Sequence, residues 1–122
     1  EYKTKNGGMD INTVILVNEM TASASELVAG AMKDYEAAYL IGTKTYGKGI
    51  VQSFYKVDET KGWLKLTTDA YFTPNGVCVQ DEGITPDLIV ELPEEAKKHS
   101  IEYIPSELDT QLTAAIKYLE EN

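Results

Sequence analysis

The fold is decided by the stretch Thr13-Val-Ile-Leu-Val-Asn-Glu-Met-Thr-Ala-Ser-Ala-Ser-Glu26. Its first residues are apolar or β-branched, which predicts a short strand over 13–17 that is buried on both faces. Asn, Thr, Ser and Glu then crowd together, and these residue types are typical of helix starts. Apolar residues follow with the spacing of one helical face: Ala24, Leu27, Val28, Ala31, Met32 and Tyr35. We therefore predict a strand followed by a helix, with charged residues such as Glu26 mostly turned away from the protein.

A second apolar run at 38–41 predicts another buried strand, so the chain opens with a strand–helix–strand unit. Such a unit usually forms two parallel strands with the helix on one face. Further strands are predicted at 50–55, 63–72 and 87–91. The predicted fold class is therefore α/β, with a mixed β-sheet and flanking helices.

The predicted elements divide the chain into two parts. Residues 1–92 hold the strands and the first helix, after a polar opening at 1–10 that is typical of a loop. Residues 93–122 combine a charged linker with a closing helix, which we expect to begin at Ser106 with Asp109 as the acidic partner of a capping box. The first part carries every candidate for chemistry.

The composition excludes several classes of function. Lys and Arg number 11 against 20 Asp and Glu, which gives a formal net charge of −9, and no basic stretch is present. We therefore expect no nucleic-acid partner, because such binding needs clustered positive charge. No apolar run approaches the roughly 20 residues that span a bilayer. Cys78 is the only cysteine, so neither an internal disulfide nor a cysteine-rich zinc site is expected, and we predict no cofactor and no metal.

Ser23 is the first candidate for chemistry, because it lies at the junction between the strand and the helix. Backbone N–H groups at a helix start lack intrahelical partners and favour negative charge nearby. A tetrahedral oxyanion formed at Ser23 would receive the N–H of Ala24. The same serine, with Glu26 three residues later, also fits a purely structural capping box. Taken alone, this segment favours the cap, because helix caps are far commoner than nucleophiles.

Lys48 is the second candidate, since the only histidine, His99, lies in a charged stretch that disfavours a Ser-His-Asp triad. Two glycines flank Lys48 and allow unusual backbone angles and close approach. The helix carries the chain away from Ser23 and the next strand returns it, so Lys48 can come back beside the serine. A neutral lysine can serve as the base of a serine nucleophile, and Gln52 on the same strand face could hold its amine. A solvated turn at Lys48 and a surface role for Gln52 are the structural alternatives.

Several segments, in order along the chain, resemble the carboxyl-terminal processing proteases, the S41 (tail-specific) serine peptidases. The nucleophile segment of that family is similar to residues 14–34, which contain Thr-Ala-Ser-Ala-Ser, and its lysine segment is similar to residues 41–52, which contain Tyr-Gly-Lys-Gly. Its later blocks resemble Leu64-Lys-Leu-Thr-Thr68, Tyr71-Phe-Thr-Pro-Asn-Gly76 and Gly83-Ile-Thr-Pro-Asp87. The roles that the resemblance implies are nucleophile for Ser23, general base for Lys48, orientation of the lysine for Gln52, and one oxyanion amide for Ala24.

The same resemblance implies a ClpP/crotonase-like fold, present here as a partial (truncated) domain, and hydrolysis of polypeptide substrates near their C-termini through an acyl-enzyme. It implies an extracytoplasmic protease, periplasmic or associated with the cell envelope. The PDZ module, N-terminal helical region, secretion signal and second oxyanion amide of the family are expected upstream of Glu1, so the chain alone is expected to be inactive or nearly so. Sheet edges opened by truncation predict a homo-oligomer or strand exchange. Met20 and Thr21 depart from the small residue and the serine usual in the family, which would reshape the pocket lip.

Two other functions stay open at this point. One is a non-catalytic interaction or oligomerisation module, in which Ser23 only caps a helix. The other is a crotonase-like acyl-thioester enzyme, in which paired backbone amides polarise a thioester. The pairing of Ser23 with Lys48 and the later Thr-Pro-Asn-Gly block argue against the second.

Overall fold

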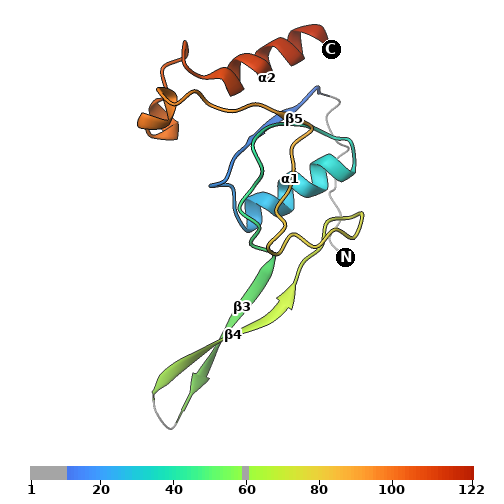
Figure 1. Ribbon diagram of the computed structural model, residues 1–122. Helices are drawn as coiled ribbons and strands as arrows, with labels where there is room; N and C mark the ends of the chain where they lie inside the picture. The colour runs from blue at the N-terminus through green and yellow to red at the C-terminus, as the bar shows by residue number, and fades with distance from the viewer. Residues whose placement is uncertain (1–10, 59–60) are drawn as a thin grey trace.

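The structure, a computed structural model, describes residues 11–58 and 61–122 (Figure 1). Its strands are β1 (Val14–Val17), β2 (Tyr39–Gly42), β3 (Ile50–Val57), β4 (Gly62–Ala70) and β5 (Leu88–Ile89). Its helices are α1 (Ala24–Asp34), α2 (Thr110–Glu121) and two short 3₁₀ turns, η1 (Ala96–Lys98) and η2 (Ile101–Tyr103). The predicted order of strands and helices is confirmed, whereas the predicted loop at 1–10 lies outside the described residues.

The parallel and antiparallel strands form two separate hydrogen-bonded units. Strands β1, β2 and β5 make a parallel sheet in the order β1-β2-β5, with Val14 opposite Tyr39 and Ile41 opposite Leu88. Among residues 11–58 and 61–122, strands β3 and β4 pair only with each other, in antiparallel register. The predicted strand–helix–strand unit with parallel strands is therefore confirmed, and the α/β class with it.

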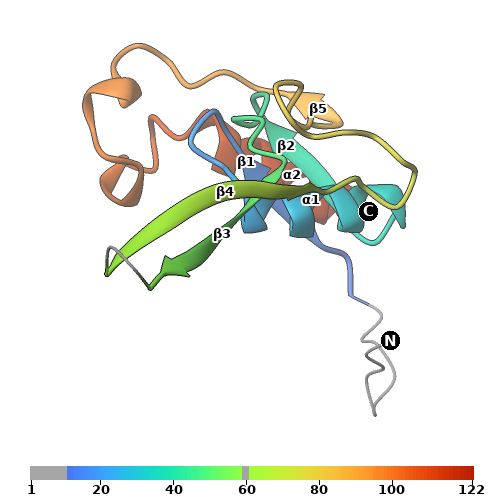
Figure 2. The same cartoon turned by 90° about the horizontal axis from the view of Figure 1, so that it is seen from below.

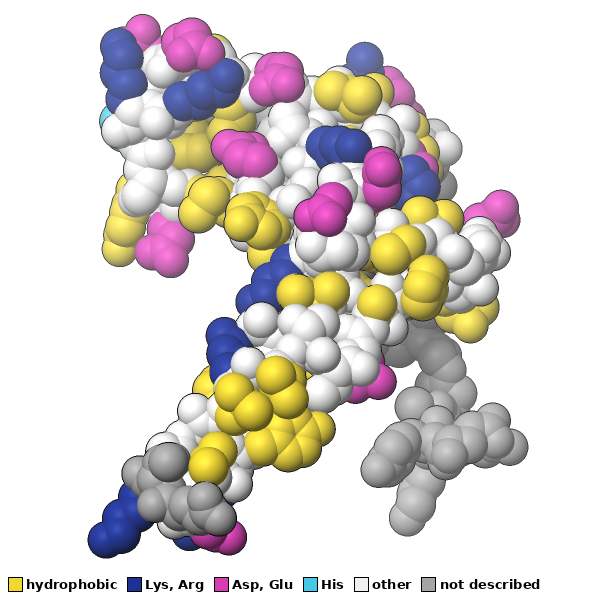
Figure 3. Space-filling view, turned by 60° about the horizontal axis from the view of Figure 1, so that its bottom comes forward, with side chains coloured by type: hydrophobic (Ala, Val, Ile, Leu, Met, Phe, Trp, Pro, Cys, Tyr) yellow, Lys and Arg dark blue, Asp and Glu magenta, His cyan; other side chains and the backbone are white. Residues whose placement is uncertain are grey.

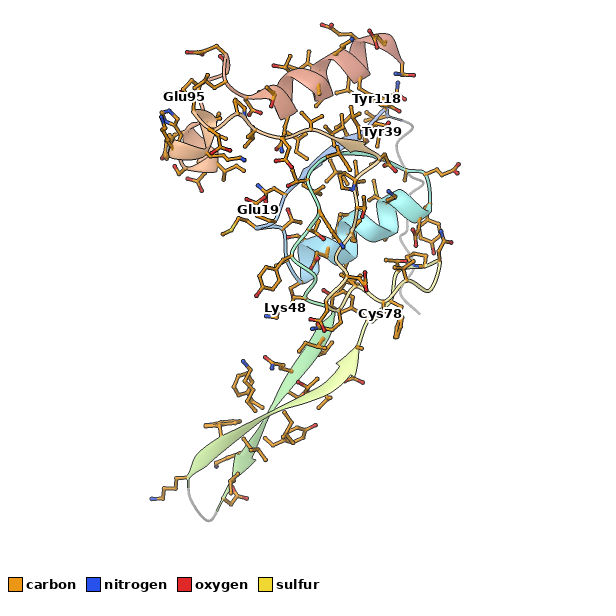
Figure 4. The ribbon with its side chains drawn as sticks, in the orientation of Figure 1. Glu19, Tyr39, Lys48, Cys78, Glu95 and Tyr118 are labelled. Atoms are coloured by element: carbon orange, nitrogen blue, oxygen red, sulfur yellow. The ribbon has the colours of Figure 1, made fainter. Side chains whose placement is uncertain are left out.

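The two long helices lie on opposite sides of the parallel sheet (Figures 1 and 2). Leu40 of β2 points toward α1, where it packs with Ala29 in the main apolar cluster. Its neighbour Tyr39 points the other way and stacks on Tyr118 of α2, with ring centroids 4.1 Å apart and planes 6° from parallel (Figure 4). Because successive side chains of a strand alternate between faces, a short strand buried on both sides anchors both helices.

Helix α1 lies against the protein with a different face from the one predicted. Its buried residues are Glu26, Ala29 and Gly30, whereas Leu27, Val28 and Tyr35 of the predicted apolar face are exposed. Gly30 makes this approach possible, because a Cβ there would lie 2.9 Å from Thr73 Cγ2 and 3.0 Å from Ile84 Cδ1. The prediction that Glu26 turns away is wrong: its carboxylate enters the protein, where four hydrogen-bond donors surround it.

The start of α2 also differs from the prediction. Asp109, rather than Ser106, is the N-cap residue, and its Oδ1 accepts the Leu112 N–H at 2.8 Å. Residues 105–108 form a turn in which Leu108 N–H donates to Pro105 O at 2.8 Å. The helix therefore begins about one turn later than expected, because the acidic residue caps it directly.

Strands β3 and β4 form a two-stranded arm that extends away from the body of the molecule (Figure 1). Large apolar side chains on this arm are exposed, namely Val51, Phe54, Tyr55, Trp63, Leu64 and Leu66. Figure 3 shows hydrophobic side chains gathered along the arm. Within the described residues, no helix has the length and apolar character to cross a membrane.

Candidate active site

Ser23 lies on a sharp turn between β1 and α1. The turn is closed by Thr21, whose N–H donates to Asn18 O at 2.9 Å and whose Oγ1 accepts Asn18 N–H at 3.1 Å. The backbone of Ser23 has φ 59° and ψ −118°, a region that residues with a side chain seldom occupy. Strained backbone of this kind gathers at functional sites, and a strained serine between strand and helix is the arrangement of known nucleophile turns. The conformation of Ser23 is thus unusual for a residue that only caps a helix, whose backbone is typically extended.

Lys48 lies in the loop between β2 and β3, at the point where the arm leaves the body (Figure 4). Gly47 before it has φ 89°, which glycine adopts without steric cost. Gly49 after it has no room for a side chain, since a Cβ there would lie 2.4 Å from Gln80 N. The flanking glycines therefore let the lysine loop follow a path that other residues would block.

All four predicted site residues line one pocket of about 340 Å³. Ser23 and Ala24 come from the start of α1, Lys48 from the loop, and Gln52 from β3. The other lining residues are Leu27, Ile50, Val51, Phe54, Lys65 and Tyr71. The structure thus brings together, on one surface, side chains that are separated by up to 29 residues in the sequence (52 − 23).

Gln52 lies beside an irregularity in the arm. The β3–β4 register shifts between Val51, which lies opposite Asp69, and Gln52, which lies opposite Thr67. Such bulges locally bend and twist a strand pair and often re-aim a side chain beside an active site. On the neighbouring strand, Lys65 lies over the ring of Phe54, with its Nζ 5.7 Å from the ring centroid, so the pocket holds a second lysine that sequence analysis did not single out.

The catalytic contacts themselves are not formed. Lys48 and Gln52 are exposed, and the described residues include no hydrogen bond between the Ser23 hydroxyl and the Lys48 amine. Catalytic hydrogen bonds are often long or poorly aligned in proteins without substrate. The roles of Ser23, Lys48, Gln52 and Ala24 therefore stay predictions.

Glu26 is the main site residue that sequence analysis missed. Its side chain is fully buried and accepts hydrogen bonds at both carboxylate oxygens. Oε2 accepts the N–H groups of Ser23 (2.8 Å) and Lys48 (2.9 Å). Oε1 accepts the Thr45 hydroxyl (2.6 Å) and the Gly47 N–H (2.7 Å). One carboxylate thus connects the serine turn directly to the lysine loop.

The hydrogen bonds of Glu26 also fix its charge. Burial by itself raises the pKa of this carboxyl, because it penalises the ionised form. The bonds from Thr45, Gly47, Lys48 and Ser23 favour the ionised form and outweigh burial, so the pKa of Glu26 is lowered below its ordinary value. Glu26 is therefore a carboxylate at neutral pH, and each of its donors keeps a charged acceptor.

Tyr71, just after β4, makes a second connection between the same segments. Its hydroxyl lies between the backbone carbonyls of Ser23, 3.0 Å away, and of Lys48, and these two acceptors share its single proton. Burial and the nearby Glu26 carboxylate raise the pKa of Tyr71, so the hydroxyl keeps the proton that it donates. Sequence analysis assigned no role to this tyrosine.

Other reactive side chains lie apart from this pocket. The predicted exclusion of His99 agrees with its position, since it is exposed and lines a different pocket with Lys97 and Gln111. Cys78 is half-buried and lines a third pocket beside Gly30. Among residues 11–58 and 61–122, no group of three or more His, Cys, Asp or Glu side chains is placed to hold a metal ion.

Comparison with known proteins identifies the class. The family model of peptidase family S41 matches residues 1–90, and the chain belongs to that family. It is 47% identical over 97 residues to a carboxy-terminal-processing protease of Bartonella bacilliformis, covering 78% of this chain and 22% of the relative. It is 41% identical over 121 residues to a carboxyl-terminal-processing protease of Synechocystis sp., covering 98% of this chain and 27% of the relative. The chain thus spans about a quarter of the length of the curated relatives that it matches.

Solved structures give the same family. The photosystem II D1 C-terminal processing protease matches with a TM-score of 0.62 and 39% identity, over 67% of this chain and 22% of that chain. The tricorn protease matches with a TM-score of 0.65 and 25% identity, over 90% of this chain and 10% of that chain. The relatives and structures named here are all proteases, and the similarities support neither a non-catalytic module nor an acyl-thioester enzyme.

Proposed function

We propose that this chain carries the serine and lysine segments of a C-terminal processing endopeptidase, in which Ser23 and Lys48 form the catalytic dyad and Gln52 orients the lysine. The observation that carries the proposal is the meeting of Ser23, Ala24, Lys48 and Gln52 in one pocket. The membership of family S41 and the names of the two bacterial relatives support the reaction type.

The proposed reaction has two stages. The neutral Lys48 amine takes the proton of the Ser23 hydroxyl while Oγ attacks the peptide carbonyl carbon, and the Ala24 N–H donates to the resulting oxyanion. The lysine then gives the proton to the leaving amine as the C–N bond breaks, which leaves an acyl-serine. Water gives a proton to the same amine and attacks the ester carbonyl; the bond from the acyl carbon to Oγ then breaks, the amine returns the proton to Oγ, and the new carboxyl terminus is released. Gln52 holds the amine in line with Ser23.

A lysine amine becomes neutral where water is excluded from it, because burial disfavours the charged form. Lys48 is exposed in this chain. The proposal therefore requires that the remainder of a full-length protease covers the pocket around the bound substrate and supplies the second oxyanion donor. The same reasoning makes the 122-residue chain by itself inactive or nearly so.

The wider expectations belong to this proposal as well. They are a ClpP/crotonase-like architecture for the complete protease domain, polypeptide tails as substrates, and an extracytoplasmic location. Homo-oligomers or strand exchange would use open strand edges, such as that of β1, which lies at one end of the parallel sheet.

The test is alanine substitution in the full-length protease, with a peptide substrate. Ser23→Ala and Lys48→Ala should each lower kcat by at least about 1,000-fold, because members of such a dyad act as a unit. Ser25→Ala and Lys44→Ala are matched controls, since both side chains are exposed and neither lines the pocket. Turnover near the wild-type value in Ser23→Ala, with only a lower melting temperature, would reduce Ser23 to a helix cap and refute the proposal.

A further inference from the structure

The same two side chains hold the backbones of both proposed catalytic residues. The Glu26 carboxylate accepts the N–H of Ser23 and the N–H of Lys48 through a single oxygen, Oε2. The single proton of the Tyr71 hydroxyl is shared between the C=O of Ser23 and the C=O of Lys48. Residues 23 and 48 are therefore bridged twice, once through their donors and once through their acceptors.

The backbone of β4 sets the place of Tyr71 in this arrangement. Ala70, the last residue of the strand, lies opposite Ile50, and the Tyr71 N–H donates to Gly49 O at 2.9 Å. The antiparallel pairing therefore continues one residue beyond the strand and aligns Tyr71 with the lysine loop. The Tyr71 ring packs against the main apolar cluster, whose members include Val17 and Leu40. Its hydroxyl thus extends from the apolar cluster of the body to the place where the serine turn and the lysine loop meet.

The Tyr71 bridge differs from the Glu26 bridge in what it controls. Glu26 belongs to α1 itself and accepts from three residues of the loop at 45–48, so its loss would disturb the whole loop. Tyr71 belongs to neither the serine turn nor the lysine loop, and its hydroxyl contacts each of them through one carbonyl. Removing this single oxygen would take away one of the two bridges between residues 23 and 48, the one on the carbonyl side, while the Glu26 bonds and the ring packing remain.

We propose that Tyr71 is a positioning residue, whose hydroxyl sets the distance between the serine turn and the lysine loop. This inference rests on the proposed function, since it assumes that Ser23 and Lys48 react together. A displacement of about 1 Å between reacting groups can lower turnover about 100-fold. The tyrosine acts through the two backbones and does not touch the substrate.

The test compares Tyr71→Phe with wild type in the full-length protease. The variant keeps the ring and removes only the hydroxyl. We expect kcat to fall about 10- to 100-fold while KM stays within about twofold, because positioning affects the reacting state rather than substrate binding. In a Ser23→Ala background, the Tyr71→Phe change should leave the affinity for a fluorescent substrate peptide unchanged. Tyr55→Phe is the matched control, since Tyr55 lies exposed on the neighbouring arm and should keep wild-type kcat.

The outcomes separate this inference from the function on which it rests. Wild-type kcat in Tyr71→Phe, with Ser23→Ala inert, would overturn the positioning role and leave the dyad intact. A rise in KM, or a loss of kcat that matches a loss of folded enzyme by circular dichroism, would also overturn it. Turnover retained in Ser23→Ala would instead remove the dyad, whatever Tyr71→Phe does.

Discussion

The Glu26→Gln substitution tests the connection between the serine turn and the lysine loop most directly. Glutamine keeps the size of the side chain but replaces one carboxylate oxygen with an amide NH₂. In the orientation with the fewest unfavourable contacts, the NH₂ group of glutamine takes the position of Oε1. The Thr45 hydroxyl can then accept a hydrogen bond from the NH₂ instead of donating one to Oε1. The Gly47 N–H then loses its acceptor.

The magnitude follows from these contacts. A buried donor left unpaired costs about 1–3 kcal/mol. The bonds from the Ser23 and Lys48 N–H groups to Oε2 each weaken by about 1 kcal/mol when their acceptor loses its charge. Of the bonds lost or weakened, only those of Gly47 and Lys48 join Glu26 to the lysine loop, so the free energy that keeps this loop closed should fall by about 2–4 kcal/mol.

Hydrogen exchange of the full-length protease, followed by mass spectrometry, measures this free energy locally. At about 1.4 kcal/mol per factor of ten, exchange of the Gly47 and Lys48 amides should accelerate about 30- to 700-fold in Glu26→Gln. Glu102→Gln makes the same charge change at an exposed site and should leave that exchange unchanged. Exchange of the two amides within about threefold of wild type in Glu26→Gln would refute the reasoning, whatever happens to activity.

Three further outcomes are expected. Acidification should open the lysine loop, because the pKa of Glu26 is lower in the folded state than in the unfolded state. The stability that the Glu26 carboxylate contributes is therefore complete above the unfolded pKa of about 4.5 and is lost as the pH falls through the lower folded pKa. The pH dependence of loop exchange below pH 5 should flatten in Glu26→Gln. Gly49→Ala should lower the melting temperature and peptide turnover together, because the new Cβ would lie 2.4 Å from the backbone N of Gln80. The free energy of unfolding should fall by about 1–3 kcal/mol. Asp109→Ala should lower the protection of the first turn of α2 by about 1 kcal/mol in hydrogen exchange, since the Leu112 N–H loses its side-chain acceptor, while Asp109→Asn should retain most of it.

Each of these expectations has a contrary result. An unaltered acid profile in Glu26→Gln would place the titrating group elsewhere. A wild-type melting temperature in Gly49→Ala would mean that the backbone at Gln80 can move away from the new Cβ without loss of folding free energy. Equal protection in Asp109→Ala and wild type would mean that another group caps α2.

The parts of the fold that local patterns control could be predicted from the sequence. The apolar run at 38–41 indicated a buried strand, and β2 covers Tyr39–Gly42. The meeting of Ser23 and Lys48 at one pocket also followed from the sequence. Helix α1 carries the chain away from Ser23, and the parallel strand β2 returns it to the edge of the sheet where α1 began. Both inferences needed only periodicity and the geometry of regular elements.

The role of Glu26 could not be predicted in the same way. A charged residue on a helix is normally solvated, and no long-range feature of the sequence marks Glu26 as an exception. Its partners Thr45, Gly47 and Lys48 are 19 to 22 residues distant and meet it only when the loop folds over the helix. The local part, in which Glu26 accepts the Ser23 N–H, did match the capping-box pattern. The exposure of Lys48 agrees with the solvated turn that the sequence left open as an alternative.

The construction of the β3–β4 arm has a consequence for how the protease should respond to heat. A two-stranded ribbon with no interior of its own is marginally stable in water. Gln52 lies on this ribbon, whereas Ser23 is attached to the body beside the parallel sheet. Warming should therefore separate the two halves of the catalytic apparatus before the body melts. Peptide cleavage should decline reversibly at temperatures where circular dichroism still reports an intact fold.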